Sequence, residues 1–470
     1  MKKILFAAAV LLSALWGCSK DDSGNEGRIN YTRIDLTDPI PAEGADYYIP
    51  VSSSSTFWFR STIGGERGDI QTGPDALTTH DGQSCILFKV PANTSYDERS
   101  VSMAVSPDQS SWYQVFSGKQ SGASASSDIA GITDASATAA AKKVYAKLKE
   151  LYGHATLTGL MEGDTYQSNA NGEALYTKTG AHPAIEGYDL IFLQYDPTPS
   201  SWSWTINYSN IEPAKEQWNA GGLVHYMWHW NVPRTKEDWE KAKNYRSNGY
   251  DFGGYAFYSE STDFSIAQAL TEGTWQNDFI MEDLGKAAAI LKLLQDAGIA
   301  VIWRPLHEAA GNYNLYGKKN NAWFWWGTGG PDLCKQLWKL MRTTFEKEYG
   351  LHNLIWVWTL DVTQGCEDEY SDWYPGDDWV DIIGVDIYED NTGAKTNQYK
   401  AALQLGGGRK MVTISECGNI PDPDKGAAAG QFWSWFTVWE GDFACNTTAY
   451  WKQLTSSSYT LTREELAPLW

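Results

Sequence analysis

The sequence predicts a (β/α)8 TIM barrel of the α/β class, preceded by a small all-β sandwich domain. Eight apolar, strand-like runs alternate with helical stretches over residues 135–470, as in parallel barrels. Before them, residues 29–120 contain only short alternating runs separated by turn residues. The 470 residues leave room for both parts, since α/β barrels reach about 250 residues or more as one domain. A doubly wound sheet is the alternative for the second part.

The first 18 residues predict an export signal of the lipoprotein type. Lys2 and Lys3 precede the apolar run Ile4–Leu15, which is too short to cross a bilayer, for which about 20 residues are needed. The run leads to Cys18 in a sequence that resembles a bacterial lipobox, although Trp16 is atypical there. We therefore expect a lipid anchor at Cys18 and an outer-membrane lipoprotein exposed on the cell surface. A cleaved secretory signal without lipid is the alternative.

Residues 19–28 are a polar tether, and residues 29–120 form the predicted β-sandwich. Its strand-like runs are Tyr47–Val51, Phe57–Arg60, Cys85–Val90 and Val101–Val105. The region loosely resembles carbohydrate-associated modules that precede bacterial glycan hydrolases, and a passive spacer is the alternative. Residues 121–134 are a linker that begins with small residues, Ser121–Ser127.

The catalytic domain is expected over residues 135–470. Its strands are predicted at Ala155–Met161, Ala184–Leu190, Leu223–Trp230, Ala300–Leu306, Leu354–Leu360, Val380–Ile387, Met411–Ser415 and Trp433–Trp439. Its helices are predicted at Ala135–Tyr152, Glu212–Ala220, Asp283–Ala297 and Asp332–Tyr349.

The composition argues against a nucleic-acid partner and is compatible with an uncharged one. Lys and Arg number 37 and Asp and Glu number 58, so the net charge is −21. Nucleic acid is excluded as the default partner, because phosphate binding needs a basic surface. The 24 Trp, 26 Tyr and 15 Phe suit a neutral sugar ligand, because their flat rings stack on apolar sugar faces, but they also fill cores. The membrane is expected to be contacted only through the anchor, and the chain is expected to be a monomer.

Neither a metal nor a cofactor is expected. His307 and Glu308 lack the second histidine of the HExxH zinc motif, and there is no phosphate-binding glycine loop. His225 and His229 lie four residues apart in a strand-like run, where a structural or substrate-binding role is favoured over zinc. The five cysteines after Cys18 have no framework spacing, which favours free thiols.

Two glutamates follow predicted strands at the end where barrels carry their functional residues. Glu308 follows the fourth strand and Glu416 ends the seventh. Two carboxylates facing each other across a barrel mouth can hydrolyse a glycosidic bond, one as acid and one as nucleophile or base. Simple ion pairing with Arg304 is the alternative.

Aromatic residues gather at the same predicted rim. Period-2 spacing places about half of them in the core. Trp323, Tyr388 and Trp439 lie at strand ends and are the better candidates for stacking on a sugar ring.

In combination, these motifs resemble glycoside hydrolase family 26. The resemblance covers about residues 135–468 and rests on Gly298–Gly327, Asn353–Trp358, Gly384–Tyr388, Ile414–Gly418 and Trp433–Phe443. It implies that Glu308 is the general acid/base and Glu416 the nucleophile. It further implies that the substrate is contacted by His229, Trp323, Tyr388 and Trp439. His307 would position the nucleophile or contact the sugar, and Arg304 would be a partner of the two carboxylates. Two departures are the longer segment Asn312–Asn321 and Cys417, where many members have Phe.

Most members of that family are β-1,4-mannanases, so the resemblance implies a retaining endo-β-1,4-mannanase acting on β-mannan polysaccharides. The alternatives are a β-1,3:1,4-glucanase or β-1,3-xylanase of the same family, and a non-catalytic surface glycan-binding lipoprotein. Other surface lipoproteins of a glycan-uptake system are expected partners by analogy alone.

Overall fold

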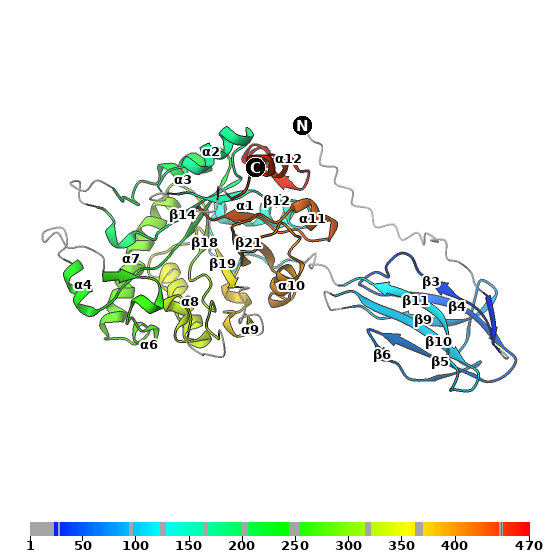
Figure 1. The fold of residues 1–470 in the computed structure, drawn as a ribbon. Coiled ribbons are helices and arrows are strands. Elements are labelled where there is room, and N and C mark those ends of the chain that lie inside the picture. The colour runs from blue at the N-terminus through cyan, green and yellow to red at the C-terminus, as the bar shows by residue number, and fades with distance from the viewer. Residues whose placement is uncertain are drawn as a thin grey trace. The chain divides into compact units, whose positions relative to one another are not determined.

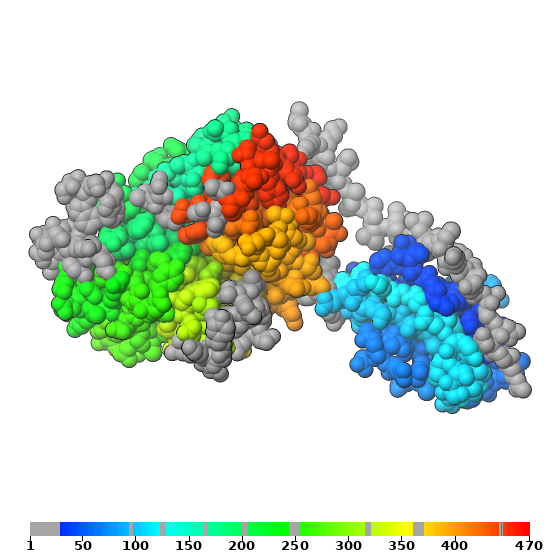
Figure 2. All heavy atoms as spheres, in the orientation of Figure 1, coloured from blue at the N-terminus to red at the C-terminus, as the bar shows by residue number. Residues whose placement is uncertain are grey.

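The computed structural model describes residues 23–26, 29–93, 97–122, 128–163, 167–198, 205–243, 254–314, 321–361, 370–440, 443 and 445–470. The predicted anchor residue, Cys18, lies outside the described residues. The chain divides into two compact units, Met1–Ser124 and Ala125–Trp470 (Figures 1 and 2). No helix among the described residues is long and apolar enough to cross a membrane.

The first unit is built from two sheets that are antiparallel except for the parallel pair β3–β11, which confirms the all-β prediction. One sheet has the order β1-β2-β4-β9-β8 and the other the order β3-β11-β10-β5-β6, with β7 also paired to β5. The strands are β1 Ser23–Glu26, β2 Ile29–Thr32, β3 Ile34–Asp35, β4 Ala45–Ser53, β5 Phe57–Ile63, β6 Glu66–Arg67, β7 Gln71–Gly73, β8 Thr78–His80, β9 Gln83–Val90, β10 Arg99–Ser106 and β11 Tyr113–Gln120. Alternate residues point inward, so that β9 buries Ile86 and Phe88 in one apolar core with Phe57 and Val101.

The second unit is a closed barrel of eight parallel strands in chain order, counted over the described residues. The strands are β13 Gly159–Met161, β14 Ile185–Asp189, β15 Leu223–Met227, β18 Val301–Arg304, β19 Leu354–Asp361, β20 Ile382–Ile387, β21 Met411–Cys417 and β22 Phe436–Val438. Each coincides with a predicted run, and the (β/α)8 prediction is confirmed. Helices surround the strands in Figure 1.

Two predicted helices begin several residues from their predicted starts, and in both a threonine side chain caps the observed start. Helix α7 begins at Trp275, eight residues before the predicted start, because the Thr274 side chain accepts a hydrogen bond from the Asn277 amide. The main helices are α1 Ala139–Leu151, α2 Ala170–Thr179, α3 Glu212–Asn219, α4 Lys236–Ala242, α6 Ile266–Ala269, α7 Trp275–Asp296, α8 Pro331–Lys347, α9 Tyr370–Trp373, α10 Thr396–Leu405, α11 Pro423–Ala428, α12 Thr448–Ser456 and α13 Arg463–Leu466.

Short elements complete the second unit. The hairpin β16 Val232–Pro233 with β17 Tyr255–Ala256 follows β15, and β12 Thr156–Leu157 pairs with β23 Thr460–Leu461. The short 3-10 turns are η1 Leu193–Tyr195, η3 Ser259–Ser261, η5 Trp325–Gly327, η6 Asp377–Trp379 and η8 Ala467–Leu469.

Of the described cysteines, Cys85 and Cys334 are buried free thiols, as the spacing predicted.

Candidate active site

The fourth barrel strand, β18, ends at Arg304 and leads into an unusual turn. Leu306 and Glu308 both adopt positive φ, 49° and 51°. Such backbone costs on the order of 1–3 kcal/mol for a residue with a side chain and persists only where its surroundings enforce it. The indole of Trp326 donates a 2.8 Å hydrogen bond to the His307 carbonyl between them. The turn thereby fixes Glu308 at the carboxyl end of the strand.

The seventh strand, β21, carries Glu416 into the same space. Its register against β20 and β22 is irregular next to this residue. Glu416 is almost completely buried and accepts two hydrogen bonds, from Arg304 Nη1 at 2.9 Å and from the Tyr388 hydroxyl at 2.6 Å. Tyr388 directly follows β20, so residues at the ends of β18 and β20 position the carboxylate carried by β21.

A third carboxylate, Asp386 on β20, completes the cluster. One oxygen each of Glu308, Asp386 and Glu416 lies within 4.8 Å of the other two. In retaining glycoside hydrolases the two catalytic carboxyl groups are about 5–5.5 Å apart, whereas in inverting ones they are about 6.5–9.5 Å apart. The Glu308–Glu416 spacing is therefore shorter than that of inverting enzymes and fits direct attack by one carboxylate.

The buried guanidinium of Arg304 holds this cluster together. It bonds Asp386 as well as Glu416, and its Nε donates to Thr359 Oγ1 at 2.9 Å. Ser415 Oγ donates to the other oxygen of Asp386 at 2.9 Å. Arg304 thus bonds a different carboxylate through each of its terminal nitrogens, and such charge-assisted hydrogen bonds are stronger than neutral ones.

Burial and the charge of Glu416 raise the pKa of Asp386 to about 7, against the opposing charge of Arg304. Burial and Glu416 also raise the pKa of Tyr388 well above its usual range. The Tyr388 hydroxyl therefore remains protonated and keeps donating to Glu416 at every pH at which a carboxylate acts.

Among the described residues, Glu308, Asp386 and Glu416 form the one group of three carboxylate or other ligand side chains close enough to share a metal ion. The buried Arg304 already bonds two of the three. A cation placed among these oxygens would lie next to the guanidinium charge and be repelled by it. The three carboxylates therefore suit proton transfer and nucleophilic attack better than metal binding.

A pair of histidines lines the wall beside the carboxylates. His229 follows β15, and its Nδ1 lies 2.5 Å from an oxygen of Asp189 at the end of β14. His229 Nε2 lies 3.2 Å from His307 Nε2. Burial and the Arg304 charge lower the pKa of His307 far below its usual range. The Asp189 carboxylate orients the His229 ring through Nδ1, and its Nε2 lies within hydrogen-bond distance of Nε2 of the neutral His307.

Aromatic rings close the wall around His229. The rings of Phe324, Phe257 and Trp439 have centroids 5.9, 4.9 and 5.3 Å from it. Trp323 packs against Phe324 at 5.9 Å and over Gly311, where an added Cβ would lie 2.2 Å from the indole. Only glycine permits this position of the Trp323 ring.

The structure therefore brings the predicted site residues into one network. Glu308, Glu416, Arg304 and Tyr388 belong to the carboxylate cluster, while His229, His307, Trp439 and Trp323 belong to the adjoining wall. Asp386 and Asp189 were not predicted from the sequence. A charged residue within or at the end of an otherwise apolar strand was the available signal for both.

A parallel eight-stranded barrel with paired glutamates after its fourth and seventh strands has the architecture of a barrel glycoside hydrolase. The chain belongs to glycosyl hydrolase family 26, whose family model matches residues 133–465.

Characterised relatives match the same region. A mannan endo-1,4-beta-mannosidase of Thermothelomyces thermophilus is 34% identical over 342 residues, 71% of this chain and 63% of that protein. A mannan endo-1,4-beta-mannosidase B of a Piromyces species is 33% identical over 65% of this chain and 47% of its own length. The chain thus spans less than two thirds of the length of these relatives.

Solved structures agree with this assignment. The family 26 domain of an endo-beta-mannanase/endo-beta-glucanase from Prevotella bryantii is 38% identical, with a TM-score of 0.63, and the match covers 72% of this chain and 99% of that domain. A Podospora anserina GH26-CBM35 beta-(1,4)-mannanase is 28% identical, with a TM-score of 0.60, over 94% of this chain and 91% of that one.

Proposed function

We propose that the protein is a retaining endo-β-1,4-mannanase that cleaves internal bonds of mannan, galactomannan or glucomannan. The observation that carries the proposal is the close approach of Glu308 and Glu416 on the fourth and seventh strands. The mannanase names of the relatives supply the substrate class.

In the first step, an oxygen of Glu416 attacks the anomeric carbon while Glu308 protonates the departing glycosidic oxygen. The bond between that carbon and that oxygen breaks, and the glycosyl group becomes an ester of Glu416. Tyr388 and Arg304 donate to the two oxygens of Glu416, which leaves its carboxylate fixed in orientation before the attack.

In the second step, Glu308 takes a proton from water, and the water oxygen attacks the same carbon and releases Glu416. The net configuration is retained. Formation of the ester removes the negative charge of Glu416, and that change favours the ionised form of Glu308 needed at this stage.

The His229–His307 pair and the aromatic wall support sugar binding. His229, held through Asp189, can offer a fixed donor or acceptor to a hydroxyl, and Trp323 and Trp439 offer apolar ring faces. These groups suit an uncharged polysaccharide.

Chromatography of the products from linear mannan, galactomannan, lichenan and β-1,3-xylan tests the proposal. A ladder of manno-oligosaccharides from the mannans alone is expected. Cleavage of lichenan or β-1,3-xylan instead would make the protein a family member of different specificity. Binding without cleavage of any of them would favour a glycan-binding protein.

We also propose that the protein is a lipoprotein anchored through Cys18 at the outer-membrane surface, because Cys18 follows an apolar export signal. Other surface lipoproteins of a glycan-uptake system are its proposed partners. Radiolabelled palmitate should enter the wild-type chain and not Cys18→Ala, and external protease should degrade the protein on intact cells. An unlabelled wild-type chain would contradict the anchor.

A further inference from the structure

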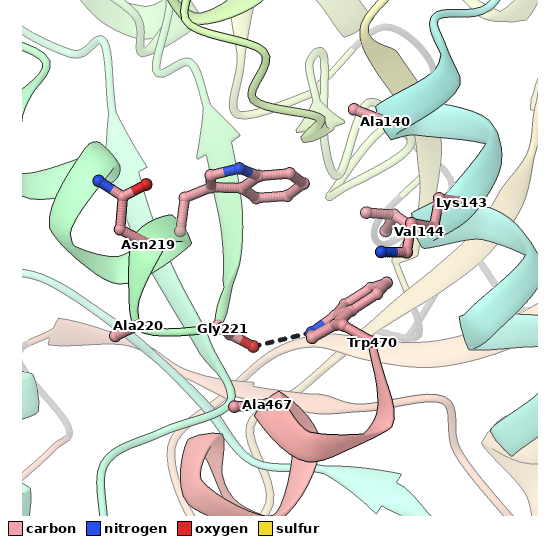
Figure 3. Close-up of a pocket in the computed structure, with 10 residues that line it drawn as sticks. Ala140, Lys143, Val144, Asn219, Ala220, Gly221, Ala467 and Trp470 are labelled. Atoms are coloured by element: carbon pink, nitrogen blue, oxygen red, sulfur yellow. Dashed lines mark hydrogen bonds between the residues drawn. The ribbon is translucent and has the colours of Figure 1, made fainter.

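A pocket of about 330 Å³ lies in the barrel unit, away from the carboxylate cluster. It is formed by the first turns of α1, the loop between α3 and β15, and the carboxyl-terminal segment after α13 (Figure 3). Its lining residues are Ala140, Lys143, Val144, Trp218, Asn219, Ala220, Gly221, Gly222, Ala467 and Trp470. The volume is that of a small-ligand site.

The pocket lies at the amino-terminal end of the barrel. Gly222 immediately precedes β15, so the loop that contributes it enters that end of the strand. The residues just before α1 bond to the same end, through Thr138 to His352 before β19 and through Thr133 to Asp381 before β20. Glu308 and Glu416 lie at the opposite ends of their strands, so a ligand here is separate from the reacting bond.

The pocket is shaped by firm packing. The Trp470 indole donates a 3.0 Å hydrogen bond to the Gly221 carbonyl, drawn in Figure 3. Gly221 has φ of 88°, and an added Cβ would lie 2.4 Å from Ala467. The loop and the carboxyl-terminal segment therefore hold each other in place, and the glycine and alanine residues leave the space open.

The chemistry of the lining suits an uncharged sugar. Two indoles, Trp218 and Trp470, line one pocket and offer large apolar ring surfaces. Lys143, whose Nζ lies 5.4 Å from the Trp470 ring centroid, and the exposed Asn219 supply polar groups at the edge. The side chains of the lining include no Asp or Glu that would demand a cation.

We propose that this pocket is a second, non-catalytic binding site for a hexose unit of β-mannan. The proposal rests on the proposed function, because the polymer that the catalytic site cleaves is the sugar available to both sites. Ala467 and Trp470 lie beyond residues 133–465, which match the family model. Holding one part of an insoluble chain at this pocket raises the effective concentration of the rest near the enzyme.

Adsorption to insoluble linear mannan tests the site in the full-length chain. All proteins carry Glu308→Gln to prevent cleavage. Adding Trp218→Ala and Trp470→Ala is expected to weaken adsorption about tenfold through loss of the second contact. A chain with Trp470→Phe and an intact Trp218 keeps both aromatic rings and is expected to retain most of the adsorption. Tyr349→Ala, an exposed aromatic before β19 at the same end of the barrel, is the matched control and should adsorb like the parent.

A second readout separates this proposal from the proposed function. With Glu308 intact, the Trp218→Ala, Trp470→Ala chain should cleave soluble mannohexaose at the wild-type rate. In the Glu308→Gln background, two results would overturn the second site while leaving the mannanase proposal standing. One is unchanged adsorption after Trp218→Ala and Trp470→Ala, and the other is an equal loss of adsorption in Tyr349→Ala. Absence of both cleavage and adsorption in the wild-type protein would instead overturn the proposed function.

Discussion

Arg304 is completely buried and bonds both Asp386 and Glu416. An unpaired charge at this depth would be costly, so the three groups form one unit that requires all its members. Its role is positional: the guanidinium fixes the Glu416 carboxylate, and Thr359 fixes the guanidinium. In the proposed mechanism, the sugar contacts Glu308 and Glu416, which carry out the proton transfer and the nucleophilic attack.

Glu308→Gln should lower kcat on mannan by about 10²–10⁴-fold, because an amide cannot supply or remove the proton. Binding of the polymer and the thermal unfolding midpoint should stay close to wild type, since the amide has nearly the same shape. Reducing-sugar release and adsorption measure the two. Glu348→Gln, exposed at the end of α8, is the control. Wild-type activity in Glu308→Gln would refute the assignment of the acid.

Tyr388→Phe should lower kcat by about 10–100-fold, because it removes a hydrogen bond to a charged group worth about 1.5–3 kcal/mol. The substitution should change kcat more than KM if the hydroxyl mainly orients Glu416. Steady-state kinetics on a soluble mannan provide the measurement. Tyr374→Phe removes an equivalent hydroxyl bonded to Asp377, away from the site, and should leave kcat unchanged. Equal losses in both variants would exclude an orienting role.

At the scale of elements, helix α2 and strands β13 and β14 enclose a second pair of buried carboxyls. Glu162 accepts the Asn171 and Gly172 amides at the start of α2, at 2.8 and 2.9 Å. Glu186 on β14 is 1% exposed, and its Oε1 has no hydrogen-bond partner. Burial and the Glu162 charge raise the pKa of Glu186 well above its usual range, against the opposing charge of Arg463, whose Nη1 lies 4.0 Å from Glu186 Oε1.

Because this pKa is raised in the folded state, the folded protein binds a proton that the unfolded chain releases above about pH 4.3. The stability is present in full below that pH and is lost as the pH rises through the folded-state pKa. Glu186→Gln should therefore nearly match wild type at pH 4 and unfold at a higher temperature at pH 8, by about 1–2 °C for each kcal/mol relieved in a unit of this size. Calorimetry at both pH values measures it.

Glu173→Gln, at an exposed position on helix α2, is the control for Glu186→Gln. It should raise the unfolding temperature at pH 8 by less. An equal gap between Glu186→Gln and wild type at pH 4 and pH 8 would mean that Glu186 is not protonated at the lower pH.

The strands and the two glutamates could be predicted because each depends on local pattern. Buried parallel strands are continuous apolar runs, and Glu308 and Glu416 directly follow two of them. Asp386 and Asp189 were missed because their importance depends on Arg304 and His229, residues 82 and 40 positions away that only the closed barrel brings close. The positive φ at Glu308 likewise depends on packing and not on residue type.

At the scale of the whole molecule, the sequence predicted the two parts of the chain because their patterns differ. Period-2 alternation is typical of half-buried antiparallel strands, and longer apolar runs separated by helices are typical of a parallel barrel. The pocket of Trp218 and Trp470 could not be predicted, because it joins residues about 250 positions apart.

The described residues of the candidate active site and of the pocket all lie in the unit Ala125–Trp470. Residues 125–470 alone should therefore cleave soluble mannan within about twofold of the full chain, because domains of this size fold on their own. Kinetics on a soluble substrate provide the measurement, with an unchanged unfolding midpoint of the barrel as control. Loss of activity on the soluble substrate would show that the first unit contributes to the catalytic site. A lower rate on insoluble mannan alone would assign the first unit a carbohydrate-binding role, whereas equal rates on both substrates would leave it the role of a spacer.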